Sequence, residues 1–97
     1  MTVIEKWLND PAVERFHGSD GNVYGIRVLG RGDNLFFQEN GQALICEIDA
    51  VNSIIYAKSV TSWSNSKKMS DSEKARVLIL IEQYYKRVYK KDLRVVA

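Results

Sequence analysis

The sequence predicts an α+β fold: a four- or five-stranded antiparallel meander sheet, with a short N-terminal helix and a long C-terminal helix packed on it. Turn residues divide residues 23–58 into short, apolar-rich segments, and connections this short favour antiparallel neighbours. Helical spacing of apolar residues appears on both sides of this region, over residues 3–9 and 71–90. Because 45% of the 97 residues are apolar, residues 1–97 can bury a core, and we expect a single domain.

The N-terminal segment has the pattern of two short helical pieces. Thr2 is followed three residues later by a glutamate, which is the spacing of a capping box and predicts a first helix over residues 3–9. Pro11 stops this helix, because the residue before a proline avoids the α conformation. The same proline can begin a second helical turn, which would carry Val13 and Phe16.

Four strands are expected in the middle of the chain. The first covers residues 23–29, the second covers 34–39, the third follows Asn40-Gly41, and the fourth covers 53–58. Asn-Gly is the strongest short hairpin signal, because a type I′ turn needs a positive φ at both central positions. This turn places Glu39 opposite Gln42, Phe37 opposite Leu44 and Leu35 opposite Cys46, while Phe36 and Ile45 meet on the other face. Since both faces are apolar near the middle, we expect each face to be covered and these strands to be central.

The C-terminal third begins with a second capping box. Ser70 and Glu73 have its spacing, and the helix that they begin is expected to run to about Lys90. Its apolar positions are Val77, Leu78, Ile81, Tyr84, Tyr85 and Val88. A face this wide is expected of a helix laid across a sheet. Residues 93–96 fit either a terminal edge strand or a frayed tail.

Cys46 and His17 are the only residues of their types. One cysteine rules out an internal disulfide, and with one histidine it gives no ordinary zinc site, so we expect no metal and no cofactor. We expect Cys46 to be buried as a small apolar residue and His17 to lie in a surface loop. The first ten residues lack a signal-peptide pattern and no apolar stretch is long enough for a membrane helix, so a reducing cytoplasm is expected.

No motif in the sequence predicts catalysis, so we do not expect an enzyme. The glycines of the turn at 30–33 lack the spacing of a phosphate-binding loop. Glu39, Glu47 and Asp49 lie near turns and strand ends, where solvated acids are common. A paired acid and base would normally sit in a pocket with substrate contacts, and nothing in the sequence marks one.

Charge is distributed unevenly along the chain. Residues 1–63 hold five basic and eight acidic side chains, a net charge of −3, whereas residues 64–97 hold nine and four, a net charge of +5. The basic stretch at 86–94 is interleaved with Tyr85 and Tyr89, which is the composition of a patch for nucleic acid or an acidic partner. Basic residues at the end of a helix also stabilise its dipole, so both interpretations stay open.

One segment resembles a known family. A strand that ends in Ile-Ile-Tyr at 54–56 is followed by Val60-x-x-Trp63, a loop, and a helix that opens Ser-x-x-Glu-Lys at 70–74 and continues Val-Leu-Ile-Leu-Ile at 77–81. This order resembles the C-terminal half of small bacterial immunity proteins, in particular the immunity protein 74 family, found beside polymorphic and contact-dependent inhibition toxins. The sequence differs from the family in having no proline soon after the tryptophan and Ser64 in place of an acidic residue.

The resemblance implies a function that needs affinity and no chemistry. An immunity protein binds one cognate toxin domain in the cytoplasm and blocks its active site or its access to substrate. If the toxin is a nuclease, its active surface is basic, and an acidic surface would complement it. The residues that would form this surface are Asp20, Asp33, Glu39, Glu47 and Asp49.

Two other classes of function stay open. The chain could be a small nucleic-acid-binding or regulatory module that uses the basic stretch at 86–94, which would bind nucleic acid in a salt-sensitive way. An enzyme is the third class, and it would need a pocket that the sequence does not indicate. A terminal edge strand could pair with a partner strand or a second copy, so we expect a monomer or a weak dimer.

Overall fold

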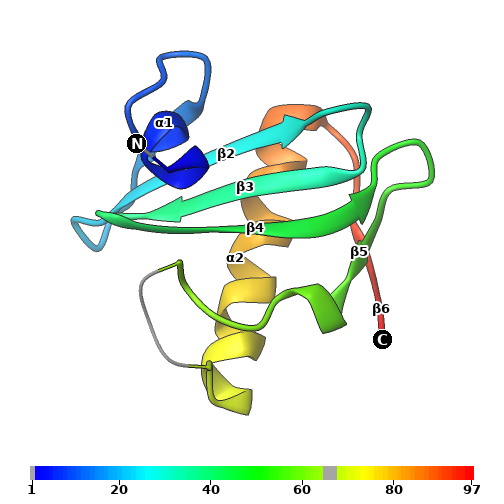
Figure 1. Ribbon diagram of the computed structural model, residues 1–97. Coiled ribbons are helices and arrows are strands. Elements are labelled where there is room, and N and C mark those ends of the chain that lie inside the picture. The colour runs from blue at the N-terminus through cyan, green and yellow to red at the C-terminus, as the bar shows by residue number, and fades with distance from the viewer. Residues whose placement is uncertain (1, 65–67) are drawn as a thin grey trace.

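The computed structural model describes residues 2–64 and 68–97, which form a six-stranded sheet with a helix on each face (Figure 1). In order across the sheet the strands are β1 (Glu14–His17), β2 (Val23–Leu29), β3 (Asn34–Glu39), β4 (Gln42–Asp49), β5 (Ile54–Tyr56) and β6 (Arg94–Val96). The short helix α1 (Val3–Leu8) covers one face and the long helix α2 (Asp71–Tyr89) crosses the other. The α+β class is confirmed. The predicted sheet of four or five antiparallel strands is wrong, because there are six described strands and β5 and β6 run parallel.

The first strand, β1, stands where the sequence pattern indicates a second helical turn. Phe16 lies opposite Tyr24 of β2, and its ring stacks on Tyr84 at a centroid distance of 5.5 Å. Arg15 points to the other face, where its Nε donates to Gln38 Oε1 at 3.1 Å. Over so few residues the apolar spacing fits either a helical turn or a strand, and pairing with β2 decides the outcome.

The last strand, β6, pairs with β5 in parallel because α2 carries the chain back across the sheet between them. Parallel neighbours need such a crossover, whereas a short turn joins only antiparallel ones. Ile54 lies opposite Arg94, whose N–H donates to Ser53 O at 2.7 Å. The C-terminal segment is therefore an edge strand and not a frayed tail. β5 is shorter than the strand predicted over 53–58, because the 3-10 helix η1 (Ala57–Ser59) follows it.

The hairpin between β3 and β4 has the predicted register, with Glu39 opposite Gln42. Its turn has a different conformation, since Asn40 has a φ of 55° while the φ of Gly41 lies outside the left-handed region. The type I′ prediction is therefore wrong, and its register is right. Asn40 holds the positive φ because its Oδ1 accepts from Val23 N at 2.9 Å and its N–H donates to Val23 O at 2.7 Å.

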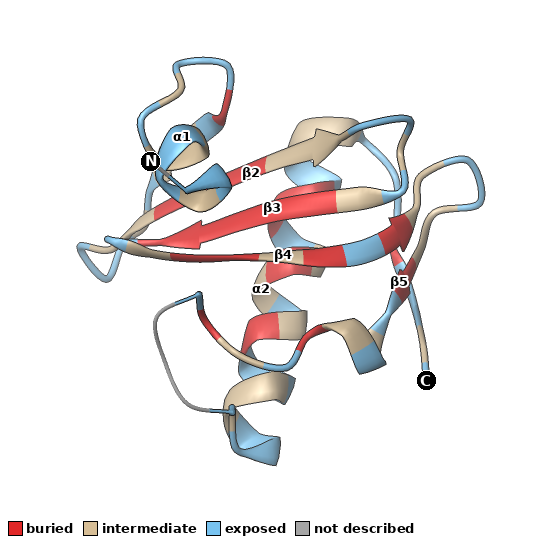
Figure 2. Ribbon diagram, in the orientation of Figure 1, coloured by how far each residue is buried: buried red, intermediate tan, exposed pale blue. Residues whose placement is uncertain are grey.

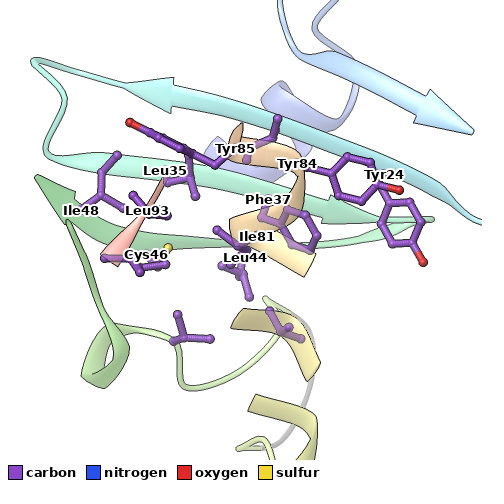
Figure 3. Close-up of a cluster of buried hydrophobic side chains, with 14 of the residues drawn as sticks. Tyr24, Leu35, Phe37, Leu44, Cys46, Ile48, Ile81, Tyr84, Tyr85 and Leu93 are labelled. Carbon is purple, nitrogen blue, oxygen red and sulfur yellow. The ribbon is translucent and has the colours of Figure 1, made fainter. Parts of the chain in front are cut away.

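Each face of the sheet carries a buried core, as the apolar middle of β3 and β4 predicts. Most residues of β3 and β4 are buried (Figure 2). Phe37 points towards α2 and Phe36 towards α1, and both are fully buried. In the larger core the rings of Tyr24 and Tyr84 lie side by side, with centroids 4.8 Å apart (Figure 3). The smaller core, under α1, consists of Val13, Phe36 and Ala43. The sheet is thus the middle layer of three.

Both helices begin at the predicted caps. Thr2 Oγ1 accepts from Glu5 N at 3.1 Å, and Ser70 Oγ accepts from Glu73 N at 3.2 Å. Lys90, with a φ of 61°, ends α2 in the left-handed conformation close to the predicted end. In the described part of the chain, no helix is long and apolar enough to cross a membrane.

Candidate functional site

The five carboxylates of the expected acidic surface lie at two opposite ends of the sheet. Asp33, Glu47 and Asp49 lie where β3 begins and β4 ends, whereas Asp20 and Glu39 lie by the hairpin end of β3. The six residues of β3 separate the two groups by roughly 17–20 Å, at about 3.4 Å per residue. The five carboxylates therefore do not form one continuous acidic surface. They form two separate groups, one at each end of β3.

The group of Asp33, Glu47 and Asp49 lies on two turns, β2–β3 and β4–β5, that are joined by backbone hydrogen bonds. We call residues 30–33 and 49–53, together with Glu47, the turn face. Ala50 N donates to Gly32 O at 2.9 Å, and Ile48 N donates to Asp33 O at 3.1 Å. Gly32 has a φ of 91°, and a Cβ there would lie 2.9 Å from Ala50 Cβ, so the close approach of the two turns requires a glycine.

The turn face displays both charge and an apolar side chain. Asp33 and Glu47 are exposed, and Val51 at the tip of the second turn is 84% exposed. The carboxylates of Asp33 and Glu47 make no hydrogen bond or ion pair with residues 2–64 and 68–97. A single exposed apolar side chain is ordinary on a protein surface, but here it stands on a braced turn beside two free acids, so all three side chains are available to another molecule.

The third carboxylate of the turn face, that of Asp49, also shapes the turn. Its Oδ2 accepts from Asn52 Nδ2 at 2.8 Å and its Oδ1 accepts from Asn52 N at 3.1 Å. These bonds favour the charged form and lower the pKa of Asp49. The turn face is not purely acidic, because Arg31 lies within it and Arg94 adjoins it through its bond to Ser53 O.

At the other end of the sheet, Glu39 is turned towards α2. Its side chain is 7% exposed, and Arg76 Nη1 and Nη2 donate to its two oxygens at 2.7 and 2.8 Å. Arg76 Nε also donates to Glu73 Oε1 at 2.7 Å, and Trp63 Nε1 donates to Glu73 Oε2 at 3.2 Å. This network ties the β3–β4 hairpin, the Trp63 corner and the first turns of α2 together, so Glu39 holds the fold together and is not displayed to solvent.

Stability is expected to depend on pH through this network. The hydrogen bonds from Arg76, and then the one from Trp63, lower the pKa of Glu73 from 4.5 to about 2. Because the folded-state pKa is the lower one, the stabilisation is fully present above pH 4.5 and is lost as the pH falls towards 2. Urea unfolding between pH 2 and 6 should show this fall in the free energy of unfolding, and Glu73→Gln should flatten it. An unchanged profile in Glu73→Gln would contradict the assignment.

Asp20 is exposed but already engaged within its loop. Its Oδ1 accepts from Asn22 N at 3.0 Å, and Tyr24 donates its hydroxyl proton to Oδ2 at 2.8 Å. These bonds lower the pKa of Asp20, with the backbone bond from Asn22 as the larger cause. Asp20 therefore orders the β1–β2 loop, and its carboxylate is less available than those of Asp33 and Glu47.

The aromatic residues of the basic stretch at 86–94 belong to the core. Tyr85 is 2% exposed, and the hydroxyl of Tyr89 accepts from Val28 N at 2.8 Å. Lys86 Nζ lies 3.0 Å from Asp92 Oδ1, and the Arg87 guanidinium lies 4.2 Å from the centre of the Phe16 ring. The stretch therefore keeps exposed positive charge, while Tyr85 is buried and the half-buried Tyr89 packs against the core, so the two rings do not form an open stacking surface for bases.

Neither the cysteine nor the histidine forms part of a reactive group. Cys46 is 1% exposed, as predicted, and burial raises the pKa of its thiol to about 12, which keeps it protonated. His17 is exposed, but it ends β1 and does not lie in the loop predicted for it. Within residues 2–64 and 68–97, no three His, Cys, Asp or Glu side chains come together to hold a metal ion.

Sequence reasoning finds the carboxylates and misses two residues that matter for the site. Arg76 fits the polar side of the predicted helix, and only its i,i+3 spacing from Glu73 hints at an ion pair. Val51 lies in a predicted turn, and no local signal marks it as exposed in a fixed position. Comparison with known proteins adds no relative: no family model, no curated protein and no solved structure matches this chain.

Proposed function

We propose that this chain is an immunity protein, which binds a bacterial toxin domain in the cytoplasm and blocks it by contact, without catalysis. The observation that carries the proposal is the turn face, where Asp33, Glu47 and Val51 are exposed on two turns braced by backbone hydrogen bonds. A surface that is rigid before binding loses little conformational entropy on binding, which favours high affinity. The resemblance of residues 54–85 to the immunity protein 74 family supports the same class.

The partner surface that fits the turn face is basic with an apolar centre. Two acids that lack partners in the described chain can each meet a lysine or arginine of the partner, while Val51 fills a small apolar pocket. The active surface of a nuclease has this positive charge, because it binds phosphates. Glu39 and Asp20 are left out of this contact, since their carboxylates are occupied within the chain.

Co-expression tests the function directly. The C-terminal domain encoded by the reading frame next to this gene would be expressed in a bacterial host with or without the chain. Growth arrest by the domain alone and recovery with the chain is the expected result. Arrest that persists despite full expression of the folded chain would contradict the proposal. Salt-sensitive binding of the chain to nucleic acid, with no protein partner, would instead favour the nucleic-acid-binding alternative.

Charge reversal on the turn face is expected to weaken the complex. Asp33→Lys combined with Glu47→Lys replaces two attractions with two repulsions, which should cost about tenfold or more in affinity, mainly through slower association. Glu14→Lys is the matched control, because Glu14 is also an exposed strand carboxylate but lies on the opposite edge strand, β1. Surface plasmon resonance against the toxin domain measures both. Equal affinity of the double variant and the control would remove the turn face from the interface.

A further inference from the structure

A hollow of about 430 Å³ opens between α1 and the tip of the β3–β4 hairpin. One wall is the side of α1, and the other is formed by the hairpin tip and the residue that follows Trp63. Its lining residues are Thr2, Ile4, Glu5, Leu8, Gly41 and Ser64. Ser64 is held in place by the bond from its N–H to Ala43 O, at 2.9 Å. The hollow is therefore built from three separate segments and is near the size at which pockets hold small ligands or side chains.

Gly41 stands at the edge of this hollow without a structural need for glycine. Its φ lies outside the left-handed region, so any residue could adopt its backbone conformation. A Cβ built on Gly41 meets no atom within 4 Å, so packing does not require glycine either. Gly32, in contrast, needs both its φ of 91° and its close approach to Ala50. A glycine that the fold does not require leaves room for another molecule to approach the backbone closely.

The lining of the hollow has the chemistry to hold an aliphatic cation. Ile4 and Leu8 offer apolar surface that continues into the smaller core. Glu5 lies between them in sequence, is exposed, and its carboxylate makes no ion pair with the described residues. Thr2 and Ser64 add hydroxyl groups, and none of the six lining residues is basic. Lysine and arginine combine an apolar stem with a cationic head, so they complement this lining.

We propose that this hollow receives a lysine or arginine side chain of the toxin domain, as a second contact besides the turn face. This inference rests on the proposed function in identifying the donor of the side chain. The stem lies along Ile4 and Leu8 and the cationic head reaches the Glu5 carboxylate. The partner backbone approaches Gly41, which lines the hollow and has no side chain.

Nuclear magnetic resonance of the chain alone tests the chemistry of the hollow. Acetyl-lysine methylamide and acetyl-arginine methylamide are titrated into the ¹⁵N-labelled chain, with acetyl-norleucine methylamide as the uncharged control. Millimolar binding is expected for ligands of this size, with amide shifts centred on Ile4, Glu5, Gly41 and Ser64. Binding of the cations should be several-fold tighter than that of norleucine. Glu5→Gln should remove this preference, and Glu14→Gln, at another exposed carboxylate, should not. Shifts that are absent, or equal for all three probes, would overturn the inference.

Filling the hollow separates this inference from the proposed function. Gly41→Leu should abolish the shifts and reduce growth rescue, whereas Gly41→Ala, which adds only a Cβ in open space, should keep most of both. If wild type and a folded Gly41→Leu rescue growth equally, the toxin does not use the hollow and the inference fails, while the function stands. If wild type does not rescue but the cationic probes bind, the proposed function fails and the cation site remains. Should Gly41→Leu fail to fold, growth rescue by Glu5→Gln replaces it. Weaker rescue than wild type would support the inference, and equal rescue would overturn it.

Discussion

Replacing Arg76 with methionine is expected to lower the free energy of unfolding by about 2–3 kcal/mol. The substitution removes both hydrogen bonds from Arg76 to Glu39, so a carboxylate with 7% side-chain exposure keeps only the bond from Gln42 Nε2 at 3.3 Å and lies next to an apolar stem. Breaking a fully buried ion pair costs about 3–5 kcal/mol, and the smaller figure here follows from the 44% exposure of Arg76, which lets water reach Glu39. Urea denaturation at pH 7 provides the measurement.

Two variants show whether the buried carboxylate is the cause. Lys86→Met breaks the pair with Asp92, in which both side chains are well exposed, and should cost less than about 0.5 kcal/mol. Glu39→Gln added to Arg76→Met removes the unpaired charge and should recover much of the lost stability. If Arg76→Met lowered the free energy of unfolding no more than Lys86→Met, the Arg76 network would contribute no more to stability than an exposed ion pair.

Phe37→Ala is expected to be more damaging than Phe36→Ala, although the two residues are neighbours and both fully buried. Phe37 packs in the larger core, with the rings of Tyr24 and Trp63 at 6.4 and 6.3 Å, and its removal should cost about 4 kcal/mol. Phe36 lies under α1, none of whose residues is buried, so α1 can move into the space. We expect a cost nearer 2–3 kcal/mol.

Hydrogen exchange distinguishes the two variants further. Phe36→Ala should raise exchange chiefly in α1, because that helix covers the smaller core, and leave α2 close to wild type. Phe37→Ala should raise exchange across both faces through global unfolding. Equal costs together with equal exchange patterns would mean that the two cores do not respond separately.

The sequence predicts those parts of the fold that depend on local signals. The helix caps at Thr2 and Ser70 can be predicted from the sequence, because each side-chain acceptor lies only three residues from its backbone donor. The hairpin register follows from the length of a two-residue loop, so it is right even though Gly41 does not have the positive φ of a type I′ turn. Local chemistry is sufficient where the partner is close in sequence.

The rest depends on contacts between distant segments. β6 pairs with β5 only because α2 returns the chain to that edge, and nothing in residues 94–96 signals a parallel partner. Likewise, Glu39 has the sequence context of a solvated hairpin acid, and only the docking of α2 brings Arg76 to it. The division of the five carboxylates between two ends of the sheet arises in the same way, since it depends on strand direction and not on spacing.

The parallel pairing of β5 with β6 also sets an order of assembly. β2, β3 and β4 are joined by short turns and can form from contacts near in sequence, which close quickly. β6 can join only after α2 has crossed the sheet, so among the described strand pairs its pairing closes the longest loop. Until that step the outer backbone of β5 is an open sheet edge, which another chain could occupy. Pairing of β6 covers the β5 edge, so the chain is most open to pairing with a neighbouring molecule before this last step.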